Sequence, residues 1–188
     1  MTLLVLGLLL FLGMHSVSIV AVGFRDLVAA QSRLGWAAFY SLVSLVGLYL
    51  IVRGYGTARL DPVVLYTPPL WLHRVASILL LPVFILFFAP YLPGRIKTAT
   101  VHPQLLAVML WSVAHLLANG TLADVVLFGA VLVWAVADRL SMNRRVGRPV
   151  PGAPPSRFND GLLIVIGIAA YVLMVTWLHK AWFGVAPL

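Results

Sequence analysis

Residues 3–22 read LLVLGLLLFLGMHSVSIVAV, a run without Asp, Glu, Lys or Arg. A helix that crosses the hydrocarbon core of a bilayer needs about 20 mostly apolar residues, so this run predicts a membrane-spanning helix. Further apolar runs follow at residues 35–52, 70–88, 101–118, 122–137 and 162–182. None of them alternates apolar and polar residues as a barrel strand does. We therefore expect an all-α integral membrane protein, a six-helix transmembrane bundle that forms one domain over residues 1–188.

The composition agrees with this class and excludes several others. Hydrophobic residues make up 62% of the 188 residues, charged residues 10%, and the mean hydropathy is +1.04. Soluble domains are about half apolar and about a quarter charged, so a free soluble enzyme is excluded. Cysteine is absent, which removes disulfides, thiolate metal sites and iron–sulfur clusters. Glutamate is absent too, so a di-iron carboxylate centre has few ligands to draw on.

Several local signals predict where these helices begin or bend. Thr67 precedes two prolines and predicts the cap of the third run. Thr121 and Asp124 have the spacing of a capping box at the start of the fifth. Asn159 is a candidate cap for the sixth. Pro82 lies inside the third run and predicts a kink there.

The positive net charge of +8 lies at the ends of the apolar runs, which indicates membrane topology and not nucleic-acid binding. The first, third and fifth loops carry nine Lys or Arg residues: Arg25, Arg33, Arg95, Lys97, Arg139, Arg144, Arg145, Arg148 and Arg157. The opposite side carries four: Arg53, Arg59, Arg74 and Lys180. Because positive loops stay in the cytoplasm, we expect both termini to face the other compartment. The basic loop at residues 139–160 is expected to be flexible and to lie near anionic headgroups.

Histidines within the runs are the best candidates for chemistry, since ionisable groups are costly inside a membrane. On this topology His15 and His102 lie on the cytoplasmic side, at depths that differ by roughly 6 Å. Two neutral imidazoles on different helices suit a bis-histidine haem iron better than zinc or an iron–sulfur cluster. Gly13 would let a flat ligand approach, and Ser18, one turn from His15, could orient it. The alternative is a core His15 bonded to a backbone carbonyl and a His102 at headgroup level.

A second polar group is expected near the opposite face of the membrane. Trp111, His115 and Asn119 recur at i, i+4 and i+8 along one helix stripe. Asp124 could accept a bond from His115, and His73 and Arg74 lie at the same depth. This group could be a second ligand site, a proton relay or a substrate-entry rim. The alternative is a polar interface that holds the helices together.

Two motifs in these runs resemble a known family. GMHS stands at residues 13–16, and HPQLL at residues 102–106 is followed by Trp111, His115 and ANG at residues 118–120. Together they resemble the NnrU family of bacterial membrane proteins, over essentially the whole chain. The resemblance implies a role in nitrite and nitric oxide metabolism in denitrifiers. That family is similar to the plastid-type zeta-carotene isomerase, a haem-b membrane enzyme.

The resemblance also implies ligands. The histidines implicated in haem ligation in that isomerase fall on His15 and His102 here. Its cysteine near the His-Pro motif has no counterpart, which puts a thiolate ligand switch and isomerase chemistry in doubt.

The expected function is accordingly that of a haem-b inner-membrane protein, in the lipid bilayer, that supports a nitrite or nitric oxide reductase system. The alternatives are a haem-dependent isomerase of a polyene or other lipid and a non-haem scaffold or transporter. The sequence leaves open whether the protein is an enzyme, which residues would be catalytic, and its oligomeric state.

Overall fold

The computed structural model describes residues 1–145 and 150–187. Within this part of the chain the regular structure is helical, with one isolated antiparallel bridge between Val64 and Thr121. The all-α expectation is confirmed. Four helical segments are long and apolar enough to cross a membrane: Thr2–Val20, Arg33–Ala58, Leu70–Phe88 and Asn159–Phe183.

The other two predicted spans are helices that fall outside this criterion. Helix α7, Pro103–Ala118, has 16 residues and is short for a span. Helix α8, Leu122–Ser141, has 20 residues but carries Asp124, Asp138 and Arg139. Both segments are helical as predicted, while the count of six spans is not established by length and hydropathy.

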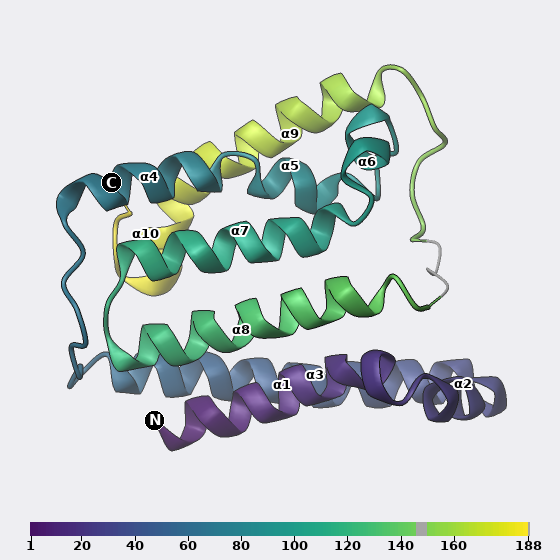
Figure 1. The fold of residues 1–188 in the computed structure, drawn as a ribbon, viewed down its shortest axis with the longest axis horizontal. Coiled ribbons are helices and arrows are strands. Elements are labelled where there is room, and N and C mark those ends of the chain that lie inside the picture. The colour runs from purple at the N-terminus through teal and green to yellow at the C-terminus, as the bar shows by residue number, and fades with distance from the viewer. Residues whose placement is uncertain (146–149, 188) are drawn as a thin grey trace. The chain divides into compact units, whose positions relative to one another are not determined.

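The chain folds into two compact units that interleave along the sequence. The first unit comprises Met1–Tyr66 and Gly120–Ser141. Its helices are α1 (Thr2–Val20), α2 (Val22–Gln31), α3 (Arg33–Ala58) and α8. In Figure 1, α1 and α2 are drawn in purple and α8 in green.

Glycines allow α1 and α3 to pack backbone against backbone. A methyl group at Gly7 would lie 2.6 Å from the backbone nitrogen of Ile51, and one at Gly54 would overlap the backbone of Leu4. Gly47 meets Phe11 in the same way. Small residues of this kind let membrane helices approach closely. The contacts set an antiparallel register in which Leu4 is opposite Gly54.

The second unit comprises Thr67–Asn119 and Met142–Leu188. Its elements are α4 (Leu70–Leu80), α5 (Val83–Phe88), α6 (Arg95–Thr100), α7, α9 (Asn159–Leu173), a π-helical turn (Met174–Leu178) and α10 (His179–Phe183). Ala107 of α7 packs on Val83 and Leu86 of α5. Gly167 brings α9 against Ile85 of α5. Helix α7 is therefore fixed against α5, which in turn contacts α9.

The helix boundaries confirm some expectations and correct others. Helices α4 and α5 are separate on either side of Pro82, as the predicted kink requires. Thr67 does not cap α4, because two prolines follow it and Pro69 precedes the helix. Asn159 is the first residue of α9 and does not cap it. Its amide instead donates to the carbonyls of Pro93 and Pro154, at 2.9 and 3.0 Å.

The predicted loops contain additional helices. Helix α2 occupies the first of them, where Phe24, Leu27 and Val28 have helical spacing. Helix α6 occupies the third loop, and α8 extends beyond Arg139 into the fifth. The remainder of that fifth loop includes Arg148, which lies outside the described residues.

Candidate functional site

His15 lies on α1, and its ring is held by the helix itself. The Nδ1 atom is 2.7 Å from the carbonyl oxygen of Phe11, one turn earlier. A carbonyl only accepts, so Nδ1 carries the proton and donates it. In a neutral imidazole the Nε2 atom then has an available lone pair. This geometry suits a metal ligand and equally suits a core histidine bonded to a carbonyl.

Three aromatic rings surround His15 within the first unit. Its ring centroid lies 4.2 Å from that of Phe11, 5.1 Å from Tyr40 of α3 and 5.8 Å from Trp134 of α8. The Trp134 contact is edge-on, at 88° between the ring planes. The surroundings of this imidazole are thus largely aromatic.

Trp134 adds a polar atom to these walls. Its Nε1 is buried and has no hydrogen-bond partner within residues 1–145 and 150–187. Leaving a buried N–H without an acceptor is costly, and tryptophan N–H groups usually find one. An acceptor on a bound ligand would satisfy it.

An apolar groove runs between α1 and α8, next to these residues. Its volume is about 620 Å³, and Gly13, Ser16, Gly129 and Trp134 are among its lining residues. A methyl group at Gly13 or at Gly129 would meet no atom within 4 Å, so both glycines border open space. A volume of this size is in the range of sites for cofactors and drug-sized ligands.

The role predicted for Ser18 stays a prediction. Helical side chains lean toward the N-terminus of their helix, and His15 contacts Phe11 one turn before it. One hydrogen bond that orients the ring is donated by Nδ1 to a backbone carbonyl.

His102 belongs to the second unit and immediately precedes α7. The sequence had placed it in the first turn of a helix that starts at residue 101, whereas the helix starts at Pro103. Its backbone dihedral angles, φ −126° and ψ 68°, are not helical. Because His15 and His102 lie in different units, their pairing stays a prediction.

The polar stripe of α7 is present as predicted. The Nδ1 atom of His115 is 2.8 Å from the carbonyl oxygen of Trp111, and the two rings lie 4.8 Å apart. The amide of Asn119 donates to the carbonyl of His115 at 2.9 Å. The three residues thus form one bonded column on α7.

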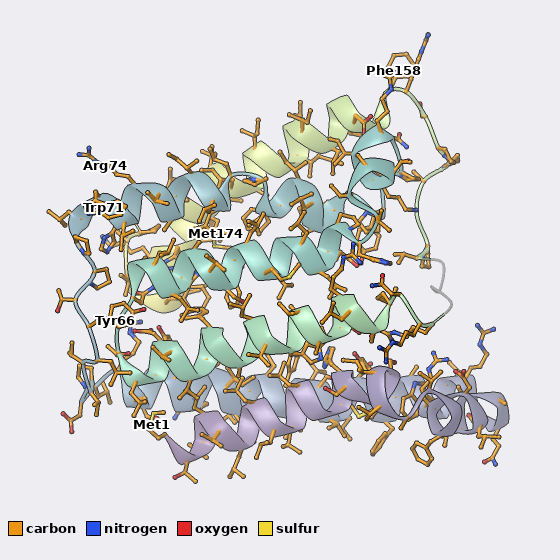
Figure 2. All side chains as sticks on the ribbon, in the orientation of Figure 1. Met1, Tyr66, Trp71, Arg74, Phe158 and Met174 are labelled. Carbon is orange, nitrogen blue, oxygen red and sulfur yellow. The ribbon has the colours of Figure 1, made fainter. Side chains whose placement is uncertain are left out.

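Helix α4 contributes the other two residues predicted on this side. The Nδ1 atom of His73 is buried and lacks a hydrogen-bond partner in the described part of the chain. Arg74 is exposed. Figure 2 shows that the side chains of Arg74 and Trp71 both point outward from the start of α4.

Asp124 lies in the first unit, and its carboxylate is almost wholly buried. Tyr55 donates its hydroxyl to Oδ1 at 2.5 Å, and the backbone nitrogen of Thr121 donates to Oδ2 at 2.9 Å. The backbone nitrogen of Asp124 donates to the Thr121 hydroxyl in return, so the predicted capping box is confirmed. Burial and the nearby Asp124 carboxylate also raise the pKa of Tyr66 in the adjoining loop. The expected bond from His115, which would join the two units, stays a prediction.

Sequence reasoning missed Tyr40, Tyr55 and Trp134. Tyr40 and Trp134 carried a signal, because each is an amphipathic aromatic residue inside a predicted span, where its polar atom needs a partner. Tyr55 lies beyond the second predicted span, and its bond to Asp124 depends on helix packing. Across residues 1–145 and 150–187, no three His, Asp, Glu or Cys side chains gather in a way that could hold a metal ion.

The family model of the NnrU protein matches residues 3–187. The chain belongs to the NnrU family. The match of this NnrU chain covers both motifs, GMHS and HPQLL. No curated protein and no solved structure shows significant similarity to it.

Proposed function

We propose that this NnrU-family chain is a haem-b protein of the bacterial inner membrane that supports nitrite or nitric oxide metabolism. One observation carries the proposal: the Nδ1 atom of His15 is committed to Phe11, so Nε2 has a lone pair for a metal. When bound, a b-type haem would supply one-electron chemistry and, on exchange of one protein ligand, a coordination position for nitric oxide. The family resemblance supplies His102 as the second ligand and the link to denitrification.

The residues around His15 fit such a group. Tyr40 and Trp134 offer aromatic faces and edges beside the imidazole. Gly13 and Gly129 leave space in the adjoining groove, and larger side chains at these two positions would fill that space. The partnerless N–H of Trp134 supplies a donor to an acceptor on a bound molecule. Ser18 would contribute from the next turn of α1, as the sequence suggests.

The membrane arrangement is part of the proposal. Helix α8 is about 30 Å long, which matches the hydrocarbon thickness, and its charges lie near its two ends. Helix α7 is about 24 Å long, and a bilayer can thin locally around a short span. With these two the chain would cross six times as a single domain, with both termini in the periplasm on the distribution of Lys and Arg.

A second candidate function is isomerisation of a polyene or similar lipid beside the haem. The apolar groove between α1 and α8 favours it, because such a substrate needs a long apolar site. A third candidate is a non-haem scaffold or transporter. The buried, partnerless Nδ1 of His73 favours this one, with Arg74, Trp111, His115, Asn119 and Asp124 as the remaining polar residues.

The absorption spectrum of the detergent-purified protein tests the proposal. Oxidised and dithionite-reduced spectra, with a pyridine haemochrome assay, should give about one b-type haem per chain. Clean protein from haem-replete cells without a Soret band would exclude both haem-dependent functions and leave the scaffold or transporter. In a denitrifying host, deletion of the gene should slow nitrite or nitric oxide reduction, and the His15→Ala variant should not restore it.

A further inference from the structure

The backbone just before His102 is strained. Val101 has φ 58° and ψ −55°. It is the only non-glycine residue with a positive φ in the described part of the chain. The backbone nitrogen of His102 donates to the carbonyl of Thr100 at 2.6 Å. This bond and these angles define the rare, strained form of the γ-turn. A side chain branched at Cβ makes a positive φ an outlier, so something must hold the turn.

The chain before the turn is anchored by α9. The carboxylate of Asp160 accepts from the backbone nitrogens of Arg95 and Ile96, at 2.9 and 3.2 Å. Those two nitrogens lie at the start of α6. At its end, the backbone nitrogen of Val101 donates to the carbonyl of Lys97 at 3.2 Å. The neighbouring Asn159 amide holds Pro93 at 2.9 Å. Helix α6 and the strained turn are thus fixed to the start of α9.

The chain after the turn is anchored by α7. Pro103 is buried, has a fixed φ and offers no backbone N–H, so the segment cannot simply continue as a helix from α6. Four residues on, Ala107 packs on Val83 and Leu86 of α5. Only Val101 and His102 connect the two anchored helices. The positive φ is the conformation that closes this short connection.

We propose that Val101 is a positioning residue that fixes the direction of His102. This inference rests on the proposed function, in which His102 is the second haem ligand. The allowed region at positive φ is small for a residue with a branched Cβ and broad for glycine. Held there by α6 and α7, Val101 leaves the turn little freedom, and His102 stays in one orientation. Glycine would accept the same turn without strain but would let His102 sample others.

The experiment compares three variants of the full-length protein. Val101→Gly frees the turn, and Val101→Ile keeps the branched Cβ. Val63→Gly is the matched control, because Val63 is an exposed valine in a loop and lies in the other unit. The readouts are haem content, the low-spin and high-spin bands of the oxidised spectrum, the affinity for added imidazole, and the thermal unfolding temperature.

We expect Val101→Gly to fold and to keep its haem, with more of it high-spin. Its affinity for added imidazole should rise about tenfold, since His102 then competes less well for the iron. Val101→Ile and Val63→Gly should match the wild type. A purely structural role would change the unfolding temperature of Val101→Gly and leave its spectrum and imidazole affinity alone, which overturns the inference. If Val101→Gly does not fold, Val101→Ala, which removes only the branch at Cβ, serves in its place, with changes in the same direction but smaller.

The result separates this inference from the proposed function. A wild-type protein without haem overturns both. Low-spin haem in the wild type with an unchanged spectrum in the glycine variant overturns only the role of Val101. Amide exchange of residues 95–102 in haem-free protein gives an independent readout, and the glycine variant should exchange faster there.

Discussion

The Nδ1 atom of His15 lies 2.7 Å from the carbonyl oxygen of Phe11, and the two rings lie 4.2 Å apart. His115 repeats this arrangement with Trp111, at 2.8 Å and 4.8 Å. Each helix carbonyl selects the tautomer of the imidazole one turn later, so both side chains present Nε2. Local geometry therefore does not distinguish the two histidines as metal ligands. Their surroundings and the family motif decide between them.

This likeness makes His115→Ala the matched control for His15→Ala. We expect His15→Ala to lose most of its haem or to change its spin state, because the proposed ligand is removed. His115→Ala and His73→Ala should keep the wild-type haem content and spectrum. The measurement is the pyridine haemochrome assay with the oxidised spectrum of each purified variant. Equal haem in all three variants would remove His15 from the ligand set, and loss in His115→Ala alone would transfer the site to α7.

The buried carboxylate of Asp124 gives a prediction for stability. Tyr55→Phe removes the donor at 2.5 Å and leaves Oδ1 of an almost wholly buried carboxylate without this partner. We expect a loss of about 1–3 kcal/mol in the free energy of unfolding. Tyr49→Phe is the control, because Tyr49 lies on the same helix and is 63% exposed. Denaturation of both variants in the same detergent measures the difference, and equal stabilities would show that the bond contributes nothing net.

The close contact between α1 and α3 gives a second prediction for stability. Gly54→Ala places a methyl group on the backbone of Leu4, where no flexible side chain can yield. The helices must separate, at a cost of about 1–3 kcal/mol. Gly56→Ala, two residues further along α3, meets no atom within 4 Å and should be neutral or slightly stabilising, since alanine favours a helix. Thermal unfolding compares the two variants, and an equal effect of both would refute the close packing.

The sequence predicts only part of this fold and of the candidate site. Apolar runs and Pro82 predicted most of the helical segments, because burial in lipid leaves a continuous signal. The Thr121–Asp124 box was predictable because the two partners are three residues apart.

The pairing of Tyr55 with Asp124 was not predictable, since it depends on how α3 packs on α8. The same limit applies to Trp134 beside His15, and to Asp160, which caps α6 across 65 positions of the chain. The strain at Val101 depends on two anchored helices and has no signature in the residue itself.

The proposed orientation in the membrane can be tested directly, because the chain contains no cysteine. Single cysteines are placed at Asp61, in the loop after α3, and at Asn143, after α8; both positions are exposed. With an excess of Lys and Arg on the odd loops, we expect Asp61→Cys to face the periplasm and Asn143→Cys the cytoplasm. A maleimide that does not cross the inner membrane should label only Asp61→Cys in intact cells, and both variants after lysis. The reverse pattern would invert the topology. Labelling of both positions in intact cells would place them on one side, which is incompatible with six spans because three of the proposed spans separate them.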